Sequence, residues 1–235
     1  YVQHRKAREN SLAIIPIRDV GTTNHRLAFT NLGNITLLEH KIEAALSAKN
    51  IRKVVVSSPD ASIENLLNQK YANNPRVLFV PRPQAYAQLN VGLIETVQDI
   101  LQHERLQSNT FSTFVVLAIE YPFVRATTID DAINTLFLFE SDSLISVRPD
   151  SSLFFQHQGH GMQPILNQEK FTKLEREALY KYTGGISVTR LGIFDKHQKV
   201  ISGTVGHIIV DQKTSLGIFS EYDLQLAKLI IEVDI

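Results

Sequence analysis

The chain has 235 residues, 43% of them hydrophobic, and its 24 Lys and Arg residues balance its 24 Asp and Glu residues. A formal net charge of zero argues against a protein that binds nucleic acid or a membrane surface through bulk electrostatics. Because cysteine is absent, the sequence excludes disulfides, a thiolate nucleophile and a Cys-ligated zinc site.

No apolar run approaches the roughly 20 residues of a membrane-spanning helix, and no signal peptide is evident, so we expect a cytoplasmic protein. The length fits one large domain, which we place at residues 11–235 after a polar, basic extension at 1–10. The first residue is Tyr1 rather than Met, so we expect a trimmed chain or a piece of a longer polypeptide.

The first predicted strand is the apolar, β-branched run 12–17. It ends at Arg18, and a polar loop with a single glycine, Gly21, follows it. Backbone N–H groups of such a loop, with a cation beside them, can bind an anion. An ordinary turn is the alternative interpretation.

Strands and helices then alternate along the chain. The predicted strands, which are short runs rich in β-branched residues, are 53–57, 77–80, 114–119 and 143–147. The predicted helices, which repeat apolar residues at helical spacing, are 36–46, 62–71, 89–107 and 128–139. Thr36 and Glu39 form a capping-box pattern, and strand 114–119, the most hydrophobic, is predicted at the sheet centre. The alternation predicts a mostly parallel sheet with helices on both faces.

This alternation stops after Pro149, and we interpret residues 151–202 as an inserted arm rather than a domain. A strand at 185–190, another at 205–210 and a helix at 223–233 complete the prediction. In the arm, His157 and His160 have the spacing of a metal-binding pair, but the glycines around them favour a loop.

Several short motifs follow one another along the chain. They are Ala-Ile-Ile-Pro-Ile-Arg at 13–18, Val-Val-Val-Ser at 54–57 with Asp60, Arg82-Pro83, Pro122-Phe123, Glu-Arg-Glu-Ala-Leu-Tyr at 175–180 and Gly-Gly-Ile at 184–186. In order and spacing they resemble motifs of the acylneuraminate cytidylyltransferases, the CMP-sialic acid synthetase group. The resemblance covers nearly the whole chain and implies a three-layer, Rossmann-like nucleotidyltransferase fold that forms a homodimer through the arm.

The resemblance also implies a reaction, the transfer of CMP from CTP to the anomeric hydroxyl of an acidic nonulosonic sugar, with Mg²⁺ assisting and pyrophosphate leaving. Such chemistry needs cations around the triphosphate and carboxylates around the metal. The implied partners are therefore CTP, the sugar and a second copy of the chain, with neither nucleic acid nor a membrane among them.

The chain departs from the family pattern at the chemistry itself. The family loop Arg-Gly-Gly-Ser-Lys reads Arg-Asp-Val-Gly-Thr at 18–22, and the family's metal motif Val-Asp-Ile-Asp falls on Leu-Gly-Ile-Phe at 216–219. An aspartate repels a triphosphate, and glycine and phenylalanine offer Mg²⁺ no side-chain oxygen. Two classes stay open: a divergent nucleotidyltransferase, which we favour by a small margin, and a non-catalytic domain of the same fold used for binding or assembly.

The candidate site residues come from these motifs. Arg18 is the candidate catalytic residue. The candidate nucleotide-binding residues are Arg18, Gly21, Ser57, Asp60 and Arg82. The candidate substrate-binding residues are Arg125, Glu175, Arg176 and Tyr180. Asp211 is the candidate metal ligand, with Glu221 and Asp223 nearby as further possibilities.

Each candidate also has a structural explanation. Arg18 could pair with an acidic neighbour such as Asp19 or Glu120, and Arg82 could be an ordinary surface residue. Ser57 and Asp60 could cap the helix that follows them. The corresponding alternatives are a salt bridge with Asp130 or Asp131 for Arg125, an exposed charged helix face for Glu175, Arg176 and Tyr180, and a solvated loop for Asp211.

Overall fold

The described residues of the computed structural model, 10–18, 21–88, 90–107, 111–152, 154–164 and 179–233, form a seven-stranded sheet of order β11-β7-β10-β6-β1-β4-β5. In that order the strands are Val205–Ile209, Ser143–Asp150, Leu179–Arg190, Thr113–Leu117, Ser11–Pro16, Ile51–Ser58 and Val77–Pro81. All neighbours pair in parallel except β10, which is antiparallel to both of its neighbours. The predicted α/β class is confirmed, and β6 is the central strand as expected.

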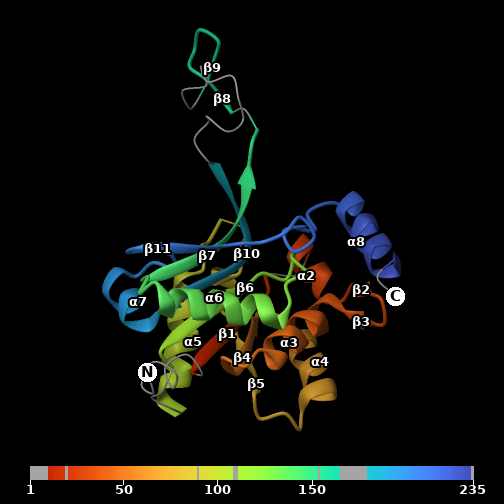
Figure 1. Ribbon diagram of the computed structural model, residues 1–235. Coiled ribbons are helices and arrows are strands. Elements are labelled where there is room, and N and C mark those ends of the chain that lie inside the picture. The colour runs from red at the N-terminus through yellow and green to blue at the C-terminus, as the bar shows by residue number, and fades with distance from the viewer. Residues whose placement is uncertain are drawn as a thin grey trace.

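Helices cover both faces of this sheet (Figure 1). The helices are Thr23–Ala28 (α2), Leu37–Ser47 (α3), Ala61–Tyr71 (α4), Ile94–Gln107 (α5), Ala126–Leu138 (α6), Leu191–His197 (α7) and Glu221–Val233 (α8), with a 3₁₀ turn at Gln84–Tyr86 (η1). None of the described helices has the length and apolar character that a bilayer crossing requires.

Strand β1, which lies next to the central strand β6, shows how one sequence pattern builds the three layers. Ala13 and Ile15 join a core cluster with α3, α4, α6 and α8, whereas Leu12 and Ile14 join a second cluster with α5 and α7. All four side chains are fully buried. Because successive side chains of a strand point to opposite faces, a strand covered on both faces must be apolar throughout.

Helix α3 begins with the predicted capping box. The Thr36 hydroxyl accepts a hydrogen bond from the backbone N–H of Glu39 at 3.2 Å, and the Glu39 carboxylate accepts one from the backbone N–H of Thr36 at 2.8 Å. Both bonds satisfy N–H groups that have no partner inside the helix. The start of α3 is therefore fixed locally, beside the small hairpin Asn31–Leu32 (β2) and Ile35–Thr36 (β3).

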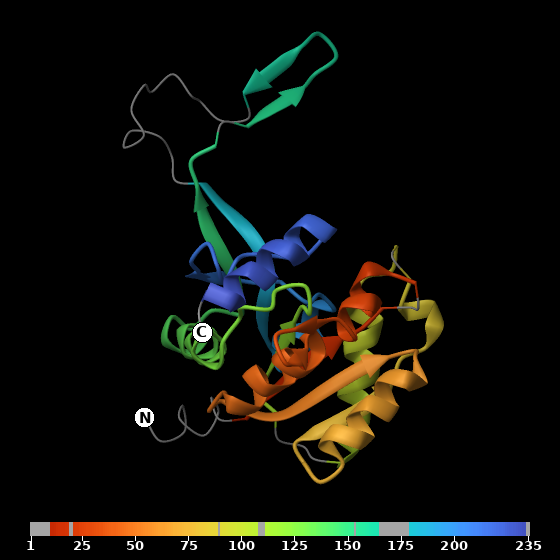
Figure 2. The ribbon, with the colours of Figure 1, turned by 90° about the vertical axis from the view of Figure 1, so that its right-hand side faces the viewer.

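Three features differ from the sequence prediction. The polar segment after β1 contains helix α2, which Thr22 caps by accepting a bond from the backbone N–H of His25 at 3.1 Å. Helix α7 follows β10 directly. Strand β10 itself, which falls inside the predicted arm 151–202, lies between β6 and β7 in the sheet. Ahead of it, the hairpin Phe155–His157 (β8) and Met162–Pro164 (β9) stands away from the sheet (Figures 1 and 2).

Candidate functional site

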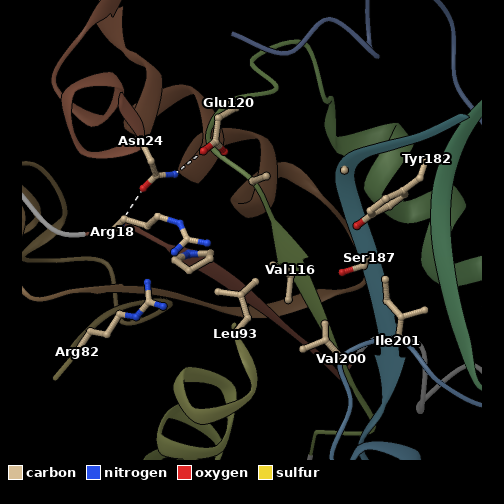
Figure 3. A pocket seen from close by; sticks show the side chains of 13 residues that line it. Arg18, Asn24, Arg82, Leu93, Val116, Glu120, Tyr182, Ser187, Val200 and Ile201 are labelled. Carbon is tan, nitrogen blue, oxygen red and sulfur yellow. Dashed lines mark hydrogen bonds between the residues drawn. The ribbon is translucent and has the colours of Figure 1, made fainter. Parts of the chain in front are cut away.

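A cavity of about 340 Å³ opens where β1, β5 and β6 end. Figure 3 shows Arg18 and Arg82 reaching into it from one side, with Tyr182 and Ser187 of β10 on the opposite side. The other lining residues are Pro16, Asn24, Leu93, Val116, Ala118, Glu120, Gly184, Val200 and Ile201. Open α/β sheets bind ligands at the carboxyl ends of their strands, so this cavity is the candidate site.

Arg18 follows β1 and is held by the side chain of Asn24 and by two backbone carbonyl oxygens. Its backbone N–H donates to Oδ1 of Asn24 at 2.7 Å, and its Nη1 donates to the carbonyl oxygens of Gln88 at 2.6 Å and Val91 at 3.4 Å. Among the described residues no carboxylate is bonded to it, and Asp19 lies outside them. The guanidinium is thus held by carbonyl oxygens, which leave its positive charge without a bonded carboxylate in the part of the chain that the structure describes.

Arg82 is buried, with 3% of its surface exposed, so it is not the surface arginine of the alternative interpretation. Its Nη1 donates to the carbonyl of Ile17 at 3.3 Å, and its Nη2 donates to that of Tyr86. Its Nε has no hydrogen-bond partner among the described residues. Burial lowers the pKa of Arg82 to about 10, and repulsion from Arg18 adds to the effect while Glu95 opposes it. Arg82 stays charged at neutral pH, and among the described residues no carboxylate is bonded to it.

Among the described residues, Glu120 is the acidic one that lines the cavity, and Asn24 holds it. The side-chain Nδ2 of Asn24 donates to Oε1 of Glu120 at 2.7 Å, while its Oδ1 accepts from the backbone of Arg18 (Figure 3). Asn24 therefore ties the end of β1 to the end of β6. Sequence reasoning missed Asn24 because it lies on the short helix α2, which was interpreted as part of a loop.

Strand β10 presents Tyr182 to the cavity by means of a bulge. The pairing of β10 with β7 shifts register between Tyr182 and Ser187, and Gly184 adopts a φ of 80° between them. Bulges of this kind redirect side chains at the rims of sites. The sequence prediction instead chose Tyr180, which lies outside the cavity lining and stacks near His207, with ring centroids 5.2 Å apart.

The other predicted nucleotide-binding residues are not among those that line the cavity. Ser57, at the end of β4, is buried and its hydroxyl has no partner. Asp60 caps α4 by accepting from the backbone N–H of Ser62 at 2.9 Å, and its Oδ2 lies 2.6 Å from Nε2 of His25. Gly21 is exposed, with a φ of 88°. Capping explains Asp60 fully, and its nucleotide role stays a prediction.

The predicted substrate and metal residues divide between two places. Arg125 lines a second, more open hollow of about 490 Å³ with Lys213 and His40. Asp211 accepts from the backbone N–H of Thr214 at 2.6 Å, and this bond chiefly lowers its pKa, with Arg125 and Lys213 contributing. Arg125 and Asp211 are thus near one another and apart from the Arg18 cavity.

Two predicted residues, Glu175 and Arg176, lie outside the described residues. Across the part of the chain that the structure describes, no three His, Asp or Glu side chains form a group that could hold a metal ion. The structure therefore brings together Arg18 and Arg82 from the predicted set and adds Asn24, Glu120 and Tyr182 to them.

The sequence matches no known family model and no curated protein. Solved structures are similar over nearly the whole chain. A 4-diphosphocytidyl-2C-methyl-D-erythritol synthase from Anaerococcus prevotii has a TM-score of 0.69 and 12% identity, covering 97% of this chain and 99% of its own. A second synthase of that name has a TM-score of 0.68 and 12% identity, covering 94% of this chain and 98% of its own. A CMP:2-keto-3-deoxy-manno-octonic acid synthetase complexed with CTP has a TM-score of 0.65 and 10% identity, covering 96% of this chain and 100% of its own.

The chain shares their fold. The expected Rossmann-like nucleotidyltransferase fold is therefore confirmed, whereas identities of 10–12% carry no conclusion about substrate.

Proposed function

We propose that this chain binds a nucleoside triphosphate, with CTP as the first candidate, in the cavity lined by Arg18 and Arg82. We further propose that it transfers CMP from CTP to an acidic sugar. The observation that carries the proposal is the pair of guanidinium groups at the ligand-binding edge of the sheet, neither bonded to a carboxylate among the described residues. A synthetase of the same fold is complexed with CTP, which supports the choice of nucleotide.

Electrostatics favours an anion at this place. Burial lowers the pKa of Arg82 and the nearby charge of Arg18 lowers it further, so a phosphate between the two guanidinium groups would relieve their repulsion. Nε of Arg82 is a buried donor that finds no acceptor within the described ranges, and such a group is unfavourable until a ligand satisfies it. The cavity volume also falls in the range of small-molecule sites, which begins at about 300 Å³.

The transfer step would use the same groups. The sugar hydroxyl oxygen forms a bond to the α-phosphorus of CTP, the bond from that phosphorus to the bridging oxygen breaks, and pyrophosphate leaves with the electron pair. Arg18 and Arg82 would stabilise the charge that builds on the phosphate oxygens. Glu120, the carboxylate lining the cavity, would accept the proton that the hydroxyl loses.

The described residues do not fit a resident Mg²⁺. Glu120 is the carboxylate they bring to the cavity, and one of its oxygens already accepts a bond from Asn24. Two neighbouring guanidinium groups also oppose a dication there. Asp211, the expected ligand, lies beside Arg125 and Lys213 instead. We therefore derive no step through a metal, and Mg²⁺ enters as a variable of the experiment.

The test measures the binding of CTP, ATP, GTP and UTP, each with and without Mg²⁺, by the shift in melting temperature and by calorimetry. A ligand that binds the folded state raises the melting temperature. We expect CTP to do so, and we expect Arg18→Gln to weaken binding by about tenfold or more, the loss of one charge-assisted contact. Arg52→Gln is the matched control, since Arg52 is an exposed residue at the start of β4, whereas the cavity lies at the carboxyl ends of the strands. Failure of all four nucleotides to bind would overturn the proposal.

A non-catalytic binding or assembly domain is the second candidate, and one observation favours it. The hairpin β8–β9 carries Phe155 and Met162, which are 48% and 62% exposed, on a segment that stands away from the sheet (Figure 2). Exposed apolar side chains on a projection suit a contact with another chain, and a second copy is the proposed partner. Nucleotide binding without pyrophosphate release from CTP and a nonulosonic acid would favour this candidate.

A further inference from the structure

Helix α3 carries a lysine in the interior of the protein. Lys41 is 1% exposed, and its ammonium donates to the backbone carbonyl of Tyr121 at 2.6 Å. Burying a charged ammonium is unfavourable unless other groups compensate it, and a leucine or methionine would fill the same space without that difficulty. The position of Lys41 therefore calls for a reason other than packing.

That reason lies in the turn that Lys41 holds. Tyr121 directly follows Glu120 at the end of β6, and its ring packs against Gly184 and meets the ring of Phe219 edge-on, with centroids 5.8 Å apart. The carbonyl of Glu120 accepts the backbone N–H of Ile218 at 2.8 Å. Lys41 fixes the same turn from the helix side. Together these contacts direct the Glu120 carboxylate to Asn24 and the cavity.

Glu120 is also the charged group that acts on Lys41. Burial lowers the pKa of Lys41 to about 7, against the opposing attraction of Glu120. Glu39, on the same helix as Lys41, is paired with Lys70, whose Nζ lies 3.3 Å from its Oε1. On α6, Asp130 accepts from two backbone N–H groups just beyond the end of α3.

The other ionisable groups beside α3 are His40 and Glu43 of the helix itself and, across the hollow that they line, Arg125 and Lys213. Among the described residues, none of these four shifts the pKa of Lys41. On α2, His25 is paired with Asp60. On β4, the residues that face the same core cluster as α3 are Val54 and Val56. Glu120 is therefore the charged group whose attraction opposes the effect of burial on the pKa of Lys41.

We propose, on the basis of the proposed anion cavity, that Lys41 is a positioning residue whose buried ammonium serves as the counter-ion of Glu120. While Lys41 is charged, it balances Glu120, and Arg18 and Arg82 attract the phosphates. Once Lys41 is neutral, Glu120 carries an unbalanced negative charge that repels them. Anion affinity thus decreases as pH rises through neutrality.

The test uses sulfate and CTP, because the charge of sulfate is constant across the range from about pH 6 to about pH 8. We expect sulfate affinity of the unaltered chain to fall about tenfold between these limits, the effect of about one pKa unit of coupling. CTP becomes more negative over the same range, so its affinity is compared between variants at each pH.

Three variants separate a charge effect from a packing effect. Lys41→Met keeps the volume, and we expect it to bind sulfate weakly at every pH. Glu120→Gln removes the repelling charge, and we expect tight binding that is independent of pH. The double variant should regain the tight binding, a rescue that a purely structural lysine would not give. Lys70→Met, which changes an exposed lysine outside the cavity, is the control and should keep the full pH profile.

The outcomes distinguish this inference from the proposed function. Absence of sulfate and CTP binding at every pH overturns both. Binding that is independent of pH in the unaltered chain, a pH profile retained in Lys41→Met, or a double variant as weak as Lys41→Met overturns the role of Lys41 alone. Far-UV circular dichroism and the melting temperature of each variant establish that it is folded before binding is compared.

Discussion

Nε2 of His25 lies 2.6 Å from Oδ2 of Asp60, although 35 positions separate the two residues in the chain. His25 belongs to α2, which follows β1, and Asp60 caps α4, which follows β4. The contact therefore ties together two neighbouring connections at the edge of the sheet where the candidate cavity opens. Hydrogen bonds from Ser62 and His25 outweigh the effect of burial and lower the pKa of Asp60.

The first prediction concerns the pH dependence of stability at Asp60. A carboxyl whose pKa is lower in the folded state stabilises the protein above its unfolded pKa of about 4. That stabilisation is lost as pH falls through the folded value. Asp60→Ala should lower the free energy of unfolding by about 1 kcal/mol near neutral pH and by less in acid. Urea unfolding near neutral pH and again in acid measures the two differences in free energy of unfolding. Asp131→Ala, at an exposed helical position, is the control.

A second prediction concerns the bulge of β10. Gly184 has a φ of 80°, and a Cβ there would lie 3.1 Å from the Tyr121 hydroxyl oxygen. Gly184→Ala should therefore destabilise the protein by about 1–2 kcal/mol and weaken nucleotide binding by displacing Tyr182. Gly192→Ala, on α7 with open space around it, should be neutral or slightly stabilising. Equal effects of the two changes in urea unfolding would contradict this account of the bulge.

The third prediction compares two leucines that differ in burial. Leu38 of α3 is fully buried, and Leu229 of α8 is 58% exposed. Leu38→Ala should lower the free energy of unfolding by about 2–5 kcal/mol, since it leaves a cavity beside β1 and β4. Leu229→Ala should stay within about 0.5 kcal/mol. A large loss at Leu229 would instead reveal that another chain covers α8.

The fourth prediction tests the proposed second copy. Phe155→Glu puts a charge on the projecting hairpin and should convert a dimer into a monomer of 26.5 kDa, as measured by light scattering. Leu138→Glu, at a position 68% exposed on α6, should leave the mass unchanged. An unaltered chain that is already monomeric at micromolar concentration would remove the basis for this proposal.

The sequence predicted the sheet well because its buried strands leave a clear pattern in the sequence. A strand buried on both faces must be apolar without a break, as the run through Ile14 and Ile15 is. Arg18 and Arg82, which the sequence predicted as nucleotide-binding residues, line the same cavity, since each follows a parallel strand and the carboxyl ends of such strands share one edge. Arg125, the predicted substrate-binding residue, lines a separate hollow instead. The sequence did not predict the short helix α2, because its residues are mostly polar and its fixed position depends on tertiary contacts.

The remaining site residues depend on details that periodicity does not contain. Tyr182 faces the cavity because a bulge shifts the register of β10, and a shift of one residue exchanges the faces of a strand. Lys41 did leave a signal. It lies four residues after Leu37 and three after Leu38, on the buried face of α3, where a charged residue conflicts with the pattern. Such a conflict is typical of a site with a task beyond folding.

The place of β10 has a consequence for how the protein is made. β1, β4, β5 and β6 all precede residue 118, yet β6 gains its second neighbour only when residues 186–190 pair with it. A growing chain on the ribosome therefore presents the open edge of its most apolar strand while about 70 further residues are synthesised, and such edges invite aggregation. Interrupted translation products that end before β10 should accordingly depend on chaperones, whereas the completed chain closes this edge from within.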